Sequence, residues 1–326
     1  MKKKIFGYII LTVVVLVFFS LFLGHSDINK EDGVYYNAFK EKYHISAVKI
    51  PEKIDFAGEL VPLYNFDTRE SLERELLVNV YWQSQTLLLL KRSKRYMPVI
   101  ESILKNYGIP DDFKYLPVIE SAFTNQVSSS GAAGFWQFLE PTAKELGLEI
   151  NKEIDERYNL EKSTEAACKF FLKSYDIYKS WTMAAASYNC GRKALNDQIL
   201  RQKTEYFYDL LLNEETSRYI FRILAIKTIF ENPAEYGFYL RDSDYYKSYE
   251  LKKVKVDTAV SNFANFAQKF NINYKILKFF NPWLRDTLLS NKTRKTYYIN
   301  IPVNLDRKFS TSPESFYLDT ANISNY

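Results

Sequence analysis

Apolar side chains recur every three or four residues from residue 70 onward, which is the spacing of one face of an α-helix. The first such segment carries Leu72 and Leu76 and continues through the run TLLLL. Pro98 is expected to begin or bend a second helix. That helix should end near Gly108, because glycine is the usual residue just past a helix end.

Four further segments show helical patterns, over residues 140–147, 161–180, 181–191 and 214–232. The first has a proline in its opening turn and a glycine at its end, which is the usual asymmetry of a helix. The last is stopped by Pro233. No alternating pattern typical of strands appears between residues 70 and 240, so this block is expected to be all-α.

The pattern changes after about residue 242. Residues 249–256 and 296–302 alternate like two strands, and two short helical patterns lie between them. Strand, helix, helix and strand predict a small α+β domain over residues 249–303. The polar tail, 304–326, is expected to be loose.

The amino-terminal segment predicts a membrane anchor. Three lysines precede a mostly apolar run from Ile5 to Gly24, and about 20 residues suffice to cross a bilayer. A cleaved signal peptide would have a shorter apolar region and a small-x-small site, which is not found here. We expect a transmembrane helix within residues 1–26 and a spacer over 27–69. The lysines favour a cytoplasmic amino terminus, so we expect the remainder of the chain to lie outside the cytoplasm.

The composition limits the kinds of ligand that the protein is expected to bind. The chain has 326 residues and a net charge of +5, but it has no long basic run, so nucleic acid is not expected. Its two histidines and its two cysteines, Cys168 and Cys190, show no metal-ligand spacing, and no disulfide can be deduced from them. The 17% aromatic content fits either a tyrosine-rich core and surface or rings that line a groove for a sugar.

The segment GIPDDFKYLPVIESAF contains the first candidate for chemistry. Glu120 follows apolar residues at helical spacing, among them Phe113 and Leu116. A glutamate on a helix is usually a solvated charge. The alternative is an acid whose pKa is raised by apolar surroundings, so that it carries a proton near neutral pH.

Three more segments offer groups that could bind a ligand. NQVSSSGAAGFWQF (125–138) combines small residues, rings and the Gln137 amide; a tight turn capped by core aromatics would look similar. ASYNCG (186–191) places Tyr188 and Asn189 at a helix end. In EETSRY (214–219), Glu215 and Tyr219 share one helix face, as residues of an ordinary surface face also would.

Taken together, these segments resemble a known family. ES (120–121), GAAGFWQF (131–138), ASYNCG (186–191) and ETSRYIFRILA (215–225) are similar, in order and spacing, to the four motifs of the lytic murein transglycosylases with a goose-lysozyme-like fold. ENPAEYGF (231–238) points to the membrane-bound D branch of that family. The resemblance implies a mainly α, lysozyme-like catalytic domain over residues 70–242, including an amino-terminal helical extension.

The resemblance also implies an activity and a set of site residues. The substrate would be peptidoglycan, cut between N-acetylmuramic acid and N-acetylglucosamine to leave a 1,6-anhydro end, for cell-wall remodelling. Glu120 would act as general acid and then as base, without metal or other cofactor. The expected substrate-binding residues are Ser121, Ser128, Gly131, Phe135, Gln137, Tyr188, Asn189, Glu215 and Tyr219.

Residues 249–303 resemble a degenerate LysM module, a small glycan-binding fold, in which Val256 replaces the usual glycine. The alternative is a domain that only packs against the enzyme. Membrane anchoring and a peptidoglycan substrate imply a position on the extracytoplasmic side of a bacterial envelope. Two other functions remain open. One is a hydrolytic lysozyme of the same fold, and the other is a non-catalytic peptidoglycan-binding protein.

Overall fold

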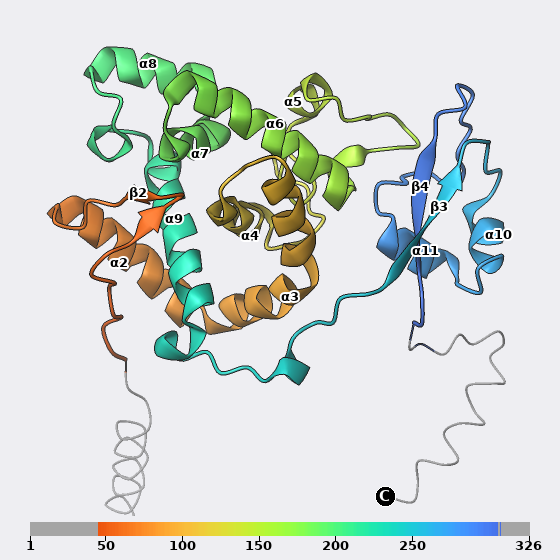
Figure 1. The fold of residues 1–326 in the computed structure, drawn as a ribbon, viewed down its shortest axis with the longest axis horizontal. Coiled ribbons are helices and arrows are strands. Elements are labelled where there is room, and N and C mark those ends of the chain that lie inside the picture. Colours follow the sequence, from red (N-terminus) through yellow and green to blue (C-terminus); the bar gives the residue numbers. More distant parts are fainter. Residues whose placement is uncertain (1–44, 306, 308–326) are drawn as a thin grey trace, which may run out of the picture. The chain divides into compact units, whose positions relative to one another are not determined.

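The computed structural model describes residues 45–305 and 307 (Figure 1). The predicted membrane anchor within residues 1–26, much of the spacer and nearly all of the tail lie outside these residues, and remain predictions. Among the residues described, no helix is both long enough and apolar enough to span a bilayer.

Helices make up most of the described chain up to Asp244. Its α-helices are α2 (Phe66–Tyr81), α3 (Gln83–Asn106), α4 (Leu116–Ser121), α5 (Glu140–Glu145), α6 (Leu160–Tyr178), α7 (Trp181–Cys190), α8 (Arg192–Gln202) and α9 (Glu214–Glu231). Short 3₁₀ helices are η1 (Asp111–Tyr115), η2 (Glu156–Tyr158), η3 (Phe207–Asp209), η4 (Pro233–Tyr236) and η5 (Asp242–Asp244). Between residues 70 and 240 this region contains no β-strand beyond isolated bridges, as predicted.

The break between the first two helices was predicted at the wrong residue. The chain leaves the helix at Trp82, with φ −88° and ψ 55°, and α3 then runs unbroken through Pro98. Pro98 and Lys94 are both exposed, so water can satisfy the Lys94 carbonyl that proline leaves without a partner. Buried Met97 and Ile100 hold the opposite face of the helix in the core. Helix α8 was also missed.

Helix α9 is the central helix of this block. It packs against α2, α4 and α7, and Figure 1 shows it beside α2. The Asn213 side chain accepts a hydrogen bond from the Thr216 amide at 2.9 Å and so caps the helix start. Buried Glu75 of α2 accepts a hydrogen bond from Arg218 Nε at 2.7 Å. These contacts fix the helix that carries Tyr219.

Part of the predicted spacer is ordered against the helical block. Residues 55–60 form a hairpin of two short strands, β1 (Asp55–Phe56) and β2 (Glu59–Leu60), and Phe56 is fully buried. The Glu59 carboxylate accepts hydrogen bonds from Ser180 Oγ at 2.8 Å and from the Thr182 amide at 3.0 Å. A carboxylate stabilises a helix start, so this hairpin supports α7.

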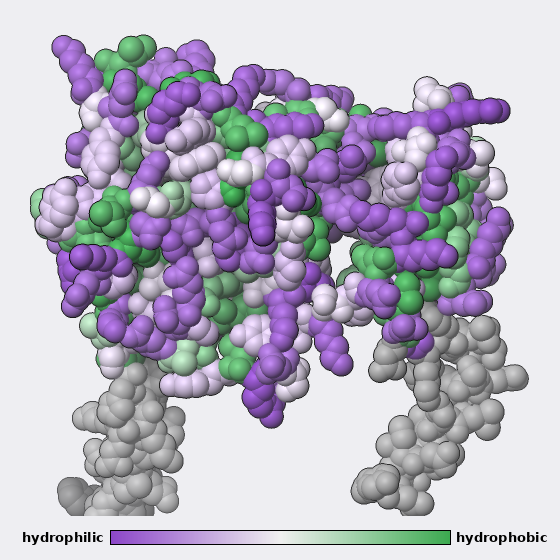
Figure 2. Space-filling model, in the orientation of Figure 1, coloured by the Kyte–Doolittle hydropathy of each residue, from purple (hydrophilic) through white to green (hydrophobic). Residues whose placement is uncertain are grey.

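The carboxy-terminal domain has the predicted order of strand, helix, helix and strand: β3 (Leu251–Val256), α10 (Phe263–Gln268), α11 (Tyr274–Phe280) and β4 (Tyr297–Pro302). The strands pair antiparallel, with Val256 opposite Tyr297. Phe263, Leu277 and Ile299 are fully buried and form the centre of a second core. On the face of the molecule shown in Figure 2, hydrophilic residues cover most of the described chain and smaller hydrophobic areas lie between them.

The segment 131–138 depends on two glycines with positive φ, at +82° for Gly131 and +78° for Gly134. A Cβ atom at Gly134 would lie 2.0 Å from the Arg157 carbonyl oxygen, whereas one at Gly131 would meet nothing within 4 Å. Only Gly134 therefore lacks room for a side chain, because the backbone of η2 lies directly against it.

Matched alanine substitutions should separate the cost of a left-handed backbone, which applies to both glycines, from the cost of the close contact, which applies to Gly134 alone. Gly131→Ala should lower the free energy of unfolding by about 1–2 kcal/mol, the cost of a left-handed alanine. Gly134→Ala should lower it by about 1–3 kcal/mol more, because the Arg157 backbone must move. Urea unfolding at constant slope measures both. Equal losses for the two variants would contradict the close contact.

Candidate active site

Glu120 lies in the last turn of the short helix α4. The helix ends because Ala122 and Phe123 both adopt left-handed conformations, with φ 53° and 55°. Arg92 donates a hydrogen bond from Nη1 to the Ala122 carbonyl at 2.9 Å, which holds this turn against α3. The Glu120 side chain is thereby fixed at a helix end rather than on an open helix face.

The Glu120 carboxyl is partly buried and has a close partner on α9. Tyr219, which is 1% exposed, donates a hydrogen bond from its hydroxyl to Glu120 Oε1 at 2.6 Å. Arg222, one helical turn further along α9, donates to the Ile119 carbonyl at 3.1 Å. The ends of two helices from distant parts of the sequence thus meet at one carboxyl.

Burial raises the pKa of Glu120 from its ordinary value of 4.5 to about 7. The Tyr219 hydrogen bond and the positive charge of Arg222 act in the opposite direction, and the negative charge of Glu215 adds to the rise. Desolvation is the largest of these effects, so it decides the direction. A carboxyl with this pKa is substantially protonated near neutral pH, which is what a general acid requires.

The segment 131–138 is tied to the Glu120 helix by buried hydrogen bonds. Ser121 is fully buried, and its hydroxyl donates to the Phe135 carbonyl at 2.8 Å. Tyr188 of α7 donates its hydroxyl to the next carbonyl, that of Trp136. The backbone at residues 135 and 136 is therefore held from two helices, and burial raises the pKa of Tyr188 well above its usual value.

Two other predicted site residues form a separate pair. Asn189 donates from Nδ2 to Glu215 Oε1 at 3.2 Å and accepts from the Thr216 hydroxyl at 2.8 Å. Glu215 is exposed, and its charge acts on Glu120 as described above. This pair joins the end of α7 to the first turn of α9.

The remaining predicted residues, Gln137, Ser128 and Gly131, belong to or contact the loop formed by residues 131–138. Gln137 donates to the Gly134 carbonyl at 2.8 Å and to the Gln126 carbonyl at 3.1 Å. Ser128 Oγ accepts from the Ala132 amide at 3.0 Å, and Gly131 is exposed. The structure brings Glu120, Ser121, Phe135, Tyr188 and Tyr219 together through direct bonds or shared neighbours. It gives no such link from Ser128 or Gly131 to Glu120.

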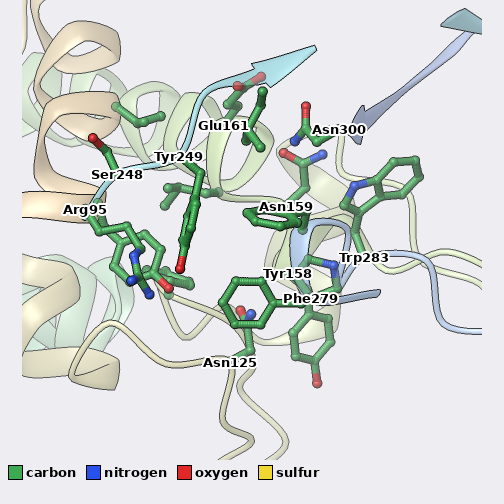
Figure 3. A pocket seen from close by; sticks show the side chains of 17 residues that line it. Arg95, Asn125, Tyr158, Asn159, Glu161, Ser248, Tyr249, Phe279, Trp283 and Asn300 are labelled. Atoms are coloured by element: carbon green, nitrogen blue, oxygen red, sulfur yellow. The ribbon is translucent and has the colours of Figure 1, made fainter. Parts of the chain in front are cut away.

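Phe135 also lines a pocket of about 180 Å³, which is shown in Figure 3. It is bounded by Arg95 of α3, by Tyr158 and by residues of the carboxy-terminal domain, including Tyr249 and Phe279. Glu120 does not line this pocket. Phe135 therefore has its carbonyl bonded to Ser121 and its side chain in a pocket that does not contain the acid.

The sequence reasoning missed Arg222, although its signal was present. Arg222 follows Tyr219 by three residues, so both lie on the same face of α9.

The cysteines Cys168 and Cys190 are both free thiols. Among residues 45–305 and 307 no group of three or more histidine, cysteine, aspartate or glutamate side chains could hold a metal ion.

Comparison with known proteins agrees with the motifs. Residues 97–210 match the transglycosylase SLT domain, and residues 252–305 match the soluble lytic transglycosylase C-terminal LysM-like domain. The chain thus contains an SLT-type lytic transglycosylase domain followed by a LysM-like domain, and both predicted modules are confirmed. The matched range of the first domain ends before Glu215 and Tyr219.

The chain is similar to membrane-bound lytic murein transglycosylase D of Escherichia coli strain K12 and of strain O6:H1. To each it is 30% identical over 227 residues, which are 68% of this chain and 49% of the relative. It therefore spans about half the length of these relatives. The 70 kDa soluble lytic transglycosylase of E. coli is a structural neighbour, with 15% identity and a TM-score of 0.39 over 58% of this chain and 32% of that one.

The raised pKa of Glu120 predicts a pH-dependent cost to stability. The folded protein holds the Glu120 proton more tightly than the unfolded chain does. The cost of ionising the buried carboxyl is therefore absent below pH 4.5 and fully present above about pH 7. The free energy of unfolding of Glu120→Gln, relative to wild type, should therefore rise across this range by up to about 3 kcal/mol. Urea unfolding at several pH values measures the difference.

The exposed Glu70→Gln is the matched control for removing a charge. If the difference between Glu120→Gln and wild type is flat with pH, Glu120 has an ordinary pKa and the desolvation argument fails.

Proposed function

We propose that this chain is a peptidoglycan lytic transglycosylase that cleaves the β-1,4 bond between N-acetylmuramic acid and N-acetylglucosamine without water. The observation that carries the proposal is the partly buried Glu120 carboxyl, with its raised pKa and its hydrogen bond from Tyr219, inside an SLT-type domain. The names of the relatives supply murein as the polymer.

In the first step, Glu120 donates its proton to the glycosidic oxygen as the bond from C1 to that oxygen breaks. The positive charge that develops at C1 is stabilised by the acetamido group of the substrate, so a second enzymic carboxylate is not required. The Tyr219 hydroxyl then stabilises the newly formed Glu120 carboxylate, because a hydrogen bond to the charged form favours it.

In the second step, the same carboxylate accepts the proton of the muramyl 6-hydroxyl while that oxygen attacks C1. A 1,6-anhydro ring forms, and Glu120 returns to its protonated state. One proton leaves and one returns, so no water is consumed. A pKa of about 7 suits both steps, since the group must give and take a proton at a similar pH.

The other predicted site residues fall into two groups, those with exposed surface and those that are buried. Gln137, Asn189 and Glu215 retain exposed surface, and we assign them to contacts with the glycan, together with Ser128, Gly131 and the accessible part of Tyr188. Ser121 and Tyr219 are buried, so we assign them to holding the loop backbone and the acid. Phe135, which is 4% exposed, contributes its carbonyl to the loop rather than an open stacking face.

We further propose that the enzyme remodels the wall from the extracytoplasmic side of the membrane, anchored by residues 1–26. The Lys-rich start and the apolar run from Ile5 to Gly24 support this position. The LysM-like match supports an added contact of the carboxy-terminal domain with glycan.

Product analysis tests the reaction. Purified peptidoglycan incubated with the protein should release muropeptides with anhydro ends, identified by mass spectrometry. Glu120→Gln, which keeps the shape but cannot transfer the proton, should lower the rate by at least about 100-fold. Products heavier by one water molecule would instead identify a hydrolytic lysozyme, with the exposed Glu215 as the candidate second carboxylate.

A non-catalytic glycan-binding protein is the remaining alternative. It predicts that neither the wild type nor Glu120→Gln releases products, while both bind peptidoglycan equally in a sedimentation assay. Retained binding with lost cleavage in Glu120→Gln alone would exclude it.

The pH profile of cleavage should respond to Tyr219. Its hydroxyl lowers the pKa of Glu120, so Tyr219→Phe should move the basic limb of the rate profile to higher pH. Tyr188→Phe is the matched control, because that hydroxyl donates to the Trp136 carbonyl and not to the acid. Equal shifts in both variants would contradict a direct effect of Tyr219 on the proton.

A further inference from the structure

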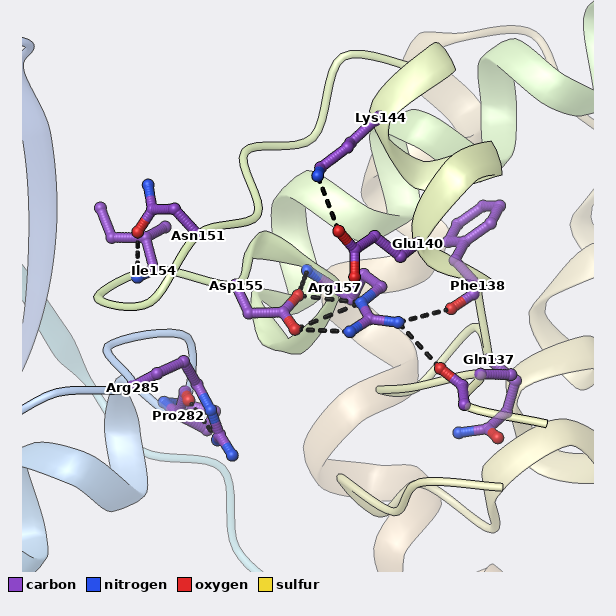
Figure 4. Close-up of polar contacts among 12 residues, drawn as sticks. Gln137, Phe138, Glu140, Lys144, Asn151, Ile154, Asp155, Arg157, Pro282 and Arg285 are labelled. Atoms are coloured by element: carbon purple, nitrogen blue, oxygen red, sulfur yellow. Dashed lines mark hydrogen bonds and ion pairs between the residues drawn. The ribbon is translucent and has the colours of Figure 1, made fainter. Parts of the chain in front are cut away.

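Arg157 of η2 has a set of partners that the proposed reaction does not yet explain. Arg157 is 9% exposed, and its guanidinium is paired with Asp155, with Nη2 at 2.7 Å from Oδ2 and Nε at 3.0 Å from Oδ1. Figure 4 shows Asp155 and Arg157 facing one another in this pair. A charge pair with so little exposure requires good geometry to offset its desolvation, so its arrangement is well defined.

The remaining nitrogen of Arg157 points at the active-site loop. Nη1 donates to the Gly131 carbonyl at 3.0 Å and to the Phe138 carbonyl at 3.2 Å. These carbonyls stand at the two ends of the segment 131–138. The middle of the same segment is held at Phe135 and Trp136 by Ser121 and Tyr188, as described above.

Arg157 is in turn held by the carboxy-terminal domain. The Asp155 amide donates to the Trp283 carbonyl at 2.9 Å, and the Arg285 amide donates to the Glu153 carbonyl at 2.7 Å. Ile154, 1% exposed, is paired with Leu284 and belongs to the core of that domain. Residues 153–155 therefore pair with 283–285 like a short strand.

Two further contacts secure the same segment. The Glu153 carboxylate accepts from the Ser290 amide at 2.7 Å and from its hydroxyl at 3.1 Å. The Arg285 guanidinium lies over the Tyr158 ring, 4.2 Å from its centroid. The segment is thus fixed on one side by the carboxy-terminal domain and on the other by Gly134, whose backbone contacts the Arg157 carbonyl.

We propose that Arg157 is a positioning residue for the reaction at Glu120, and that the carboxy-terminal domain supports the active-site loop through Asp155 and Arg157. The proposal rests on the proposed function for its activity readout. It assigns the LysM-like domain a role within the catalytic unit that is independent of any glycan it binds.

The shape of arginine is what this role requires. A planar guanidinium can bind a carboxylate through one edge and two carbonyls through another nitrogen, whereas a lysine ammonium is a single point charge. Arg157→Lys should therefore keep the charge but release one end of the loop. A displacement of about 1 Å in a positioning group can cost about 100-fold in rate.

The test compares Arg157→Lys with Arg192→Lys in the full chain. Arg192 is the matched control, because it also bonds a backbone carbonyl, that of Phe170 at 3.2 Å, but belongs to α8 and does not touch the loop. Arg157→Lys should lower kcat for peptidoglycan cleavage by 10- to 100-fold with a smaller change in KM, and Arg192→Lys should not. Both rates are measured per folded molecule.

Hydrogen exchange supplies a readout that does not depend on activity. Amides of residues 131–138 should exchange at least 10-fold faster in Arg157→Lys than in wild type, with no such change in Arg192→Lys. Faster exchange with no cleavage by the wild type would refute the proposed function and leave the structural role standing. Cleavage by the wild type with unchanged kcat and exchange in Arg157→Lys would overturn the positioning role.

A third variant covers a failure to fold. Asp155→Asn keeps the size of the side chain and weakens its hold on Arg157. If Arg157→Lys does not fold, Asp155→Asn should show the same fall in kcat and the same rise in loop exchange. Wild-type values for both in a folded Asp155→Asn would refute the claim that the carboxy-terminal domain supports the loop through the Asp155–Arg157 side-chain pair.

Discussion

The cost of burying one carboxyl governs the arrangement of this protein. Glu120 is withdrawn from water far enough for desolvation to outweigh a hydrogen bond from Tyr219 and the positive charge of Arg222. If those two partners prevailed, the group would be an ordinary carboxylate with no proton to give. If burial had no opposition, the carboxylate formed during the proposed reaction would be too unstable. The pKa of about 7 is the balance between these effects.

Maintaining that balance requires support from distant parts of the chain. The Asn213 cap and the Glu75–Arg218 pair fix α9, and the left-handed turn after Ser121 fixes α4. The loop 131–138 closes the arrangement, since its backbone is bonded to α4, to α7 and to Arg157. Because Arg157 is held through residues that pair with the LysM-like domain, the second domain belongs to the same structural unit as the acid.

Local patterns predicted much of this, and tertiary contacts account for the rest. Helical spacing identified most helices, because it depends on residues close in sequence. The order of four motifs nominated Glu120 and Tyr219 as site residues, and their roles remain a prediction. The continuous helix through Pro98 is tolerated because Pro98 and Lys94 lie on an exposed face, and the spacing of apolar residues did not predict this. The burial of Ser121 and the hydrogen bonds from Arg157 to the loop depend on chain segments that only folding brings together. Glu120 could be nominated from sequence, but its partner atoms could not.

The most direct test of the central claim is the pKa of Glu120 itself. The protein would be labelled with carbon-13 at the glutamate carboxyl, and the Glu120 signal would be assigned by its loss in Glu120→Gln. The chemical shift would then be followed from pH 3 to pH 9. The account predicts a midpoint near 7 for this signal. A midpoint near the ordinary value of 4.5 would show that burial does not hold the proton, and would contradict the account.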